Sequence, residues 1–186
     1  MKPLASTATL VLAAEDVPVR APAVRVSPSV PPPVPEGSVR FATFNAALSR
    51  QRPGTMSAAL ASGEWGRARA VAETVQWVRP DVLLVNEFDH DPSGRAVELF
   101  ARKYLERGWN GAGGVEYSYA YTAPVNTGVA SGADLNGDGR VVTEPGSDAY
   151  AGDAFGFGRF PGQYGMAVFS RYPLDAVRAR TFRLLP

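Results

Sequence analysis

The residues best suited to chemistry stand at the end of an apolar run, in the segment VLLVNEFDH at residues 82–90. Four apolar residues are followed there by Asn86 and Glu87. Another apolar segment, VRFATFNA at residues 39–46, carries Asn45 near its end in the same way. The carboxyl ends of strands in an α/β sheet border the crevice in which ligands bind. One polar residue at a strand end is more often structural than functional, but two at equivalent strand ends favour a site.

The elements that must position these residues alternate between strand and helix periodicity. Residues 39–46 and 81–87 are typical of strands buried on both faces of a sheet. Between them, residues 63–78 show helical spacing, and Arg79-Pro80 ends this helix because the residue before a proline disfavours the helical conformation. The apolar positions of the helix are Ala68, Val71, Ala72, Val75 and Val78, and its outward positions are Arg67, Arg69, Glu73 and Gln76.

A second helix is predicted over residues 96–109, and further strands within residues 116–125 and 164–174. A long stretch rich in Gly and Asp separates these two strands. The resulting order is strand, helix, strand, helix, strand, loop, strand. Such an order predicts an α/β fold in which helices cover a sheet.

Composition sets limits on the class of protein. The chain has 186 residues, of which 45% are hydrophobic, and a net charge of +1, as expected for one globular domain. It contains no cysteine, which excludes disulfides, thiolate zinc sites and cysteine nucleophiles. A charge close to balance predicts no overall attraction to nucleic acid, although local arginine contacts with phosphate stay open.

The first 37 residues are expected to lie outside the folded domain. Residues 1–14 hold a short, mostly small and apolar run, which is too short to span a membrane and reads either as a signal peptide or as a disordered terminus. Residues 17–36 contain seven prolines and are typical of a semi-rigid linker. The folded domain is expected over residues 38–186. A signal peptide would make the protein secreted or periplasmic, and without one we expect it in the cytoplasm.

Three segments together resemble a known family. VRFATFNAAL, RPDVLLVNEFD and GQYGMAVFSRYPL are similar, in this order, to the first half of the endonuclease/exonuclease/phosphatase superfamily, which has the DNase I-like fold. The resemblance covers residues 38–174 and implies a sandwich of two sheets flanked by helices. In the family, an Asn closes the first strand, a Glu closes the second strand and binds a divalent metal, and a later strand carries the pattern found here at residues 165–173. The matching positions are Asn45 and Glu87.

The resemblance implies a metal-dependent phosphoesterase that cleaves phosphodiesters or phosphomonoesters. Glu87 is expected to bind Mg²⁺ or Mn²⁺, since such a cation can be held by one carboxylate when substrate phosphate and water complete its shell. Asn45 is expected to contact a phosphate oxygen or to orient a water molecule without adding negative charge. The expected partner is therefore a phosphoester substrate, with nucleic acid among the candidates.

The family's catalytic His and Asp residues have no counterpart in this chain. In the family, the catalytic histidine lies near the C-terminal end of the domain, after an Asp-x-Asn pair, and is paired with an Asp. His90, which is the single histidine, matches neither context and is interpreted as a loop residue at the rim of the site. The family domain needs two sheets and roughly 250 residues, whereas about 150 residues here read as folded. We therefore interpret the chain as the N-terminal part of the domain, with the remaining half as its partner, and expect this part alone to be inactive.

An alternative reading is a secreted, non-catalytic binding module with the same fold. The segment DLNGDGR places Asp134, Asn136 and Asp138 at the first, third and fifth positions of a calcium loop. The twelfth position should be a bidentate Glu but is Pro145. Asn-Gly and Asp-Gly pairs are also strong turn signals, so both a calcium site and a plain Gly-rich loop stay open.

Overall fold

The protein is built around one mixed sheet of four strands. The structure is a computed structural model that describes residues 32–33 and 35–182, so the expected signal segment and most of the proline-rich linker lie outside the described residues. The strands are β1 (Phe41–Asn45), β2 (Val82–Asn86), β3 (Tyr119–Thr122) and β4 (Met166–Ser170). Their order in the sheet is β1-β2-β4-β3, with β1 parallel to β2 and β4 antiparallel to both of its neighbours.

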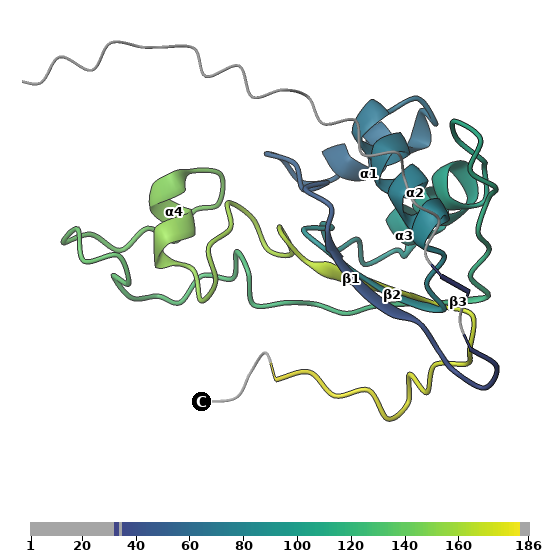
Figure 1. Cartoon of the computed structure of the whole chain (residues 1–186). Helices are drawn as coiled ribbons and strands as arrows, with labels where there is room; N and C mark the ends of the chain where they lie inside the picture. The colour runs from purple at the N-terminus through teal and green to yellow at the C-terminus, as the bar shows by residue number, and fades with distance from the viewer. Residues whose placement is uncertain (1–31, 34, 183–186) are drawn as a thin grey trace, which may run out of the picture.

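Helices cover one face of this sheet (Figure 1). They are α1 (Thr55–Ala61), α2 (Gly66–Val78) and α3 (Arg95–Phe100), and a π-helical turn, η1 (Ala101–Leu105), continues α3. Helix α2 ends as the sequence predicts, because Arg79 adopts a left-handed conformation before Pro80 and its N–H bonds to the Val75 carbonyl at 2.7 Å. The sequence did not predict α1, and the helix expected over residues 96–109 is shorter.

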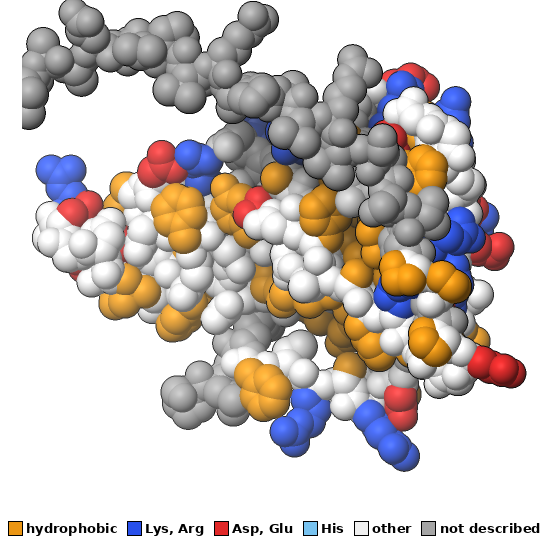
Figure 2. Space-filling model, viewed as in Figure 1, with side chains coloured by type: hydrophobic (Ala, Val, Ile, Leu, Met, Phe, Trp, Pro, Cys, Tyr) orange, Lys and Arg blue, Asp and Glu red, His pale blue; other side chains and the backbone are white. Residues whose placement is uncertain are grey.

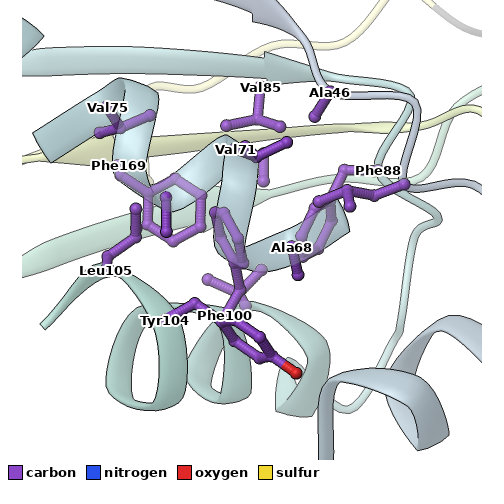
Figure 3. Close-up of a cluster of buried hydrophobic side chains, with 14 of the residues drawn as sticks. Ala46, Ala68, Val71, Val75, Val85, Phe88, Phe100, Tyr104, Leu105 and Phe169 are labelled. Carbon is purple, nitrogen blue, oxygen red and sulfur yellow. The ribbon is translucent and has the colours of Figure 1, made fainter. Parts of the chain in front are cut away.

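The hydrophobic core lies between this face and the helices (Figure 3). Phe100 of α3 stands at its centre, with its ring centroid 5.8 Å from those of both Phe88 and Phe169 and 6.0 Å from that of Tyr104. All four rings are at most 1% exposed. Each such pair adds about 0.5–1.5 kcal/mol beyond the burial of its area. The strand carrying Phe169 is thereby fixed against α3, which follows β2.

No helix of the described part of the chain covers the opposite face of the sheet, which we call the open face. Phe41 is 72% exposed and Met166 is 44% exposed, and both belong to this face. The prediction that residues 39–46 are buried on both faces is therefore wrong, because helices cover one face alone. A cavity of about 460 Å³ lies between the open face and the segment that runs to the C-terminus, lined among others by Leu84, Val168 and Phe182. Figure 2 shows hydrophobic side chains gathered above this segment.

Gln76 differs from its predicted position on the outside of α2. Its side chain is 2% exposed. The amide nitrogen donates to the carbonyls of Tyr104, Leu105 and Arg107, and the amide oxygen accepts the N–H of Trp109. A helix that ends in a π-helical turn leaves several carbonyl groups without helical partners, and Gln76 bonds to them. Periodicity alone assigns every polar residue to the surface and so misses this role.

Residues 124–162 form a separate lobe around the short helix α4 (Asp148–Asp153), which the sequence also did not predict (Figure 1). The lobe is held by two β-bridges, between Thr127 and Gly156 and between Ala130 and Ala154. No helix in the described part of the chain is long and apolar enough to cross a membrane.

Candidate active site

Asn45 and Glu87 meet at one edge of the sheet. Strands β1 and β2 are parallel and in register, with Asn45 opposite Asn86, so both strands end at the same edge. The amide nitrogen of Asn45, Nδ2, donates a hydrogen bond of 2.7 Å to Glu87 Oε1. The amide oxygen of Asn45, Oδ1, accepts a hydrogen bond of 3.1 Å from the Ala47 N–H. Because the amide nitrogen faces an acceptor and the amide oxygen faces a donor, these two partners define the orientation of the Asn45 side chain.

The backbone at this edge turns sharply in both strands. Glu87 has φ 55° and Ala47 has φ 48°, which are left-handed conformations that residues other than glycine rarely adopt. The two turns are joined because the N–H groups of Ala46 and Leu48 bond to the carbonyls of Asn86 and Glu87, each at 3.1 Å. Such conformations cost about 1–3 kcal/mol each and gather at functional sites. Here they direct the Glu87 side chain toward Asn45.

A second polar pair lies beside the first on the open face of the sheet. Asn86 Nδ2 donates to Thr43 Oγ1 at 3.0 Å. Thr43 stands two residues before Asn45 and therefore on the same face of β1. The sequence analysis did not include Thr43 among the residues of the candidate site. Its spacing of two residues from Asn45, which places both on one face of a strand, was a signal that could have found it.

The loop after Glu87 is held by two further groups. The Phe88 N–H bonds to the Gly165 carbonyl at 3.0 Å, and a Cβ atom on Gly165 would lie 2.8 Å from the Phe88 carbonyl oxygen. Asp89 is 5% exposed, and its carboxylate accepts the N–H of Arg50 at 2.9 Å and that of Tyr164 at 3.1 Å. Burial raises the pKa of Asp89 above its usual value, although these hydrogen bonds act in the opposite direction. The close approach of the Phe88 carbonyl oxygen explains why position 165, where the family pattern begins, is a glycine.

His90 lies in the loop after β2, as predicted, and is half-buried. Its Nδ1 atom is 3.2 Å from Thr122 Oγ1, and this hydroxyl donates to the Met166 carbonyl at 3.0 Å. The His90 N–H bonds to the Gly162 carbonyl at 2.8 Å. These contacts direct the imidazole toward the end of β3.

The residues at the edge fit a divalent cation that keeps most of its water ligands. The described residues contain no group of three or more His, Asp or Glu side chains arranged to hold a metal ion. Mg²⁺ in phosphoryl-transfer sites is commonly bound through one or two carboxylates together with substrate phosphate and water. Glu87 offers one such carboxylate, and Asn45 orients it by donating a hydrogen bond to one of its two oxygens. Glu87 thus supplies one carboxylate of the kind that such a site uses.

The segment that resembles a calcium loop lies in the lobe, and its side chains bond to their own backbone. Asp134 accepts the N–H groups of Gly137 and Gly139, at 2.7 and 2.8 Å. Asn136 accepts the N–H of Asp138 at 3.0 Å, and Asp138 accepts that of Arg140 at 3.0 Å. These are side-chain turns of the kind that Asn and Asp form in tight loops.

Asp153 holds the two ends of this loop. Its carboxylate is 1% exposed and accepts the N–H of Val142 at 2.9 Å and that of Leu135 at 3.0 Å. The hydrogen bond from Val142, joined by others from the loop backbone, lowers the pKa of Asp153 although burial opposes it. Sequence reasoning did not single out Asp153, because no local pattern links it to a loop that begins 19 residues earlier.

The chain belongs to the endonuclease/exonuclease/phosphatase family. The family model matches residues 42–186, which include Asn45, Glu87 and the segment that begins at Gly165. The resemblance seen in the sequence is thereby confirmed, and the mixed sheet with its flanking helices is consistent with a DNase I-like fold. The protein is thus a member of a family of phosphatase-type and nuclease-type hydrolases. Neither the curated proteins nor the solved structures contain a significant match to this chain.

Proposed function

We propose that the protein hydrolyses phosphodiester or phosphomonoester bonds with the help of Mg²⁺ or Mn²⁺ bound at Glu87. The observation that carries this proposal is the 2.7 Å contact between Asn45 and Glu87 at the shared edge of β1 and β2. A carboxylate that is oriented by an amide and directed by a left-handed turn is prepared to bind a cation before the substrate arrives.

Each residue of the pair has a distinct role in the proposal. Glu87 Oε1 accepts from Asn45, which leaves Oε2 as the ligand oxygen. Asn45 holds the carboxylate in place and keeps the site from gaining a second negative charge. When bound, the cation supplies positive charge that stabilises the charge developing on the phosphoryl group. Thr43 and Asn86 extend the polar edge on the open face of the sheet, where a phosphoester can approach.

We further propose that the general base and the remaining phosphate ligands come from further residues of the same domain. These residues would pack on the open face of the sheet, beside Asn45. Exposed Phe41 and Met166, and Tyr119, which is 40% exposed, support this part of the proposal. Leu84, Met166 and Val168 line one cavity on this face, and an exposed apolar patch commonly marks an interface. The chain of 186 residues is then expected to be inactive by itself, since a missing general base costs about 10²- to 10⁴-fold in rate.

Location outside the cytoplasm stays a prediction from the sequence.

The experiment that tests the proposal compares Glu87→Gln with the unchanged full-length protein. We expect loss of hydrolysis of a generic phosphodiester and phosphomonoester, weaker binding of Mn²⁺ measured by electron paramagnetic resonance, and an unchanged thermal unfolding curve. Glu116→Gln is the matched control, since Glu116 is exposed and distant in sequence from the site. Unchanged turnover of Glu87→Gln that still requires metal would rule out Glu87 as the metal ligand.

A further inference from the structure

A second concave site lies between the loop after β1 and the lobe. Its volume is about 380 Å³, within the range of small-molecule sites. It is lined mainly by Gln51, Arg52 and Pro53 from the loop after β1 and by Pro145, Arg159 and Phe160 from the lobe. Two guanidinium groups and no carboxylate thus border this cavity, which we call the arginine cavity.

Arg159 is held in place by contacts on two sides. Its Nη1 atom contacts Gln51 Oε1, and its Nη2 atom lies 2.5 Å from Asp148 Oδ1 at the start of α4. The Arg159 side chain is 23% exposed. A guanidinium has five N–H donors in a planar fork, so these two contacts leave donors for a ligand.

Arg52 supplies the charge that is not balanced. It is exposed, and within the described part of the chain its side chain forms neither an ion pair nor a hydrogen bond. Asp148 offsets the charge of Arg159, but among the described residues no carboxylate forms an ion pair with Arg52. The arginine cavity is therefore electropositive and suited to an anion.

Buried hydrogen bonds fasten the arginine cavity to the loop that follows Glu87. Gln163 is fully buried; its Nε2 donates to the Arg50 carbonyl and its Oε1 accepts the Arg159 N–H, both at 2.6 Å. Asp89, two residues after Glu87, accepts the Arg50 N–H at 2.9 Å. The walls of the cavity are thus held together without a ligand, and such preorganisation lowers the cost of binding.

We propose that the arginine cavity binds a phosphate group, as a second anionic subsite for a substrate whose reacting phosphate lies at Glu87. The forked donors of arginine match the oxygen atoms of phosphate and can bind them in pairs. The phosphate can belong to the backbone of a single-stranded nucleic acid or to the phosphate chain of a nucleotide, and both sources share this chemistry. The assignment of the subsite to a substrate rests on the proposed function.

Nuclear magnetic resonance titration of the full chain without divalent metal tests the proposal. The probes are inorganic phosphate, a nucleoside triphosphate and a short single-stranded oligonucleotide. Gly146 also lines the arginine cavity. We expect its backbone amide and the side-chain Nε–H resonances of Arg52 and Arg159 to shift on addition of the nucleotide or oligonucleotide. Arg52→Gln should weaken this binding by about tenfold or more, because a hydrogen bond between charged groups is lost. Arg67→Gln, on the exposed side of α2, is the matched control and should change little.

The outcomes separate the two phosphate sources and the two proposals. Tighter binding of the oligonucleotide than of the nucleotide would identify a nucleic acid backbone as the source, and the reverse order would identify a nucleotide. No shift at the cavity, a response to inorganic phosphate alone, or an equal loss in Arg67→Gln would overturn the subsite. The titration uses no metal, so its result does not depend on whether Glu87 binds a cation, and the subsite and the proposed metal site can fail independently.

Discussion

Asn45 Nδ2 lies 2.7 Å from Glu87 Oε1, although the two residues are 42 positions apart in the chain. The contact exists because the parallel strands β1 and β2 end at the same edge of the sheet, and the backbone then turns through a left-handed conformation after each strand. The amide has one partner on each side, so it acts as a fixed support for the carboxylate.

Asn45→Ala should weaken Mn²⁺ binding or hydrolysis by the full-length protein by roughly 10- to 100-fold, which is the usual effect of removing the partner of a metal ligand. The variant also removes the acceptor of the Ala47 N–H. Metal titration followed by electron paramagnetic resonance measures the effect. Asn110→Ala, which removes an exposed contact with Glu73, serves as the control. Equal metal affinity in the Asn45 and Asn110 variants would contradict the supporting role.

Gly165→Ala should lower the free energy of unfolding by about 1–3 kcal/mol, the usual cost of forcing extra atoms into a packed site. The new Cβ would lie 2.8 Å from the Phe88 carbonyl oxygen and 3.1 Å from the His90 nitrogen. Urea denaturation measures the change. Gly66→Ala is the control, because nothing lies within 4 Å of its Cβ position, and this variant should be neutral or stabilising. A neutral Gly165→Ala would show that the close backbone contact is not required.

Asp153 should make the stability of the protein fall at acidic pH. Its pKa is lower in the folded chain than in the unfolded chain, chiefly because of the hydrogen bond from the Val142 N–H. Its contribution is therefore complete above the unfolded value, near pH 4, and is lost as the pH falls through the folded value. Asp153→Asn should be less stable at pH 7 and lose less stability on acidification. Urea denaturation from pH 7 to pH 2.5 measures both effects, and parallel curves for the two proteins would contradict this assignment.

Calcium should not bind appreciably at residues 134–145. The missing bidentate Glu at the twelfth position removes the ligand that closes a calcium loop. In the structure, the Asp134 carboxylate bonds to backbone N–H groups. Titration calorimetry of the full-length protein measures calcium affinity directly. A submillimolar site that disappears in Asp134→Ala would show that this prediction is wrong and would favour the calcium-binding alternative.

The sequence by itself determined the local features of the site. Apolar runs placed Asn45 at the end of β1 and Glu87 directly after β2. Helical spacing with Arg79-Pro80 predicted where α2 ends. The family resemblance was readable for the same reason, since its segments are short and continuous. Periodicity reports which residues of one element share a face, and this information is contained within a few turns of chain.

Tertiary structure alone decided which faces are covered and which side chains meet. Phe41 looks like a core residue in the sequence but lies on the open face, and Gln76 looks exposed but is buried against the carbonyls at the end of η1. The contact between Asn45 and Glu87 and the arginine cavity both depend on segments that are distant in sequence. Burial and hydrogen bonding are properties of neighbours in space, and those neighbours are set when strands pair and loops pack, not by the pattern within any one segment.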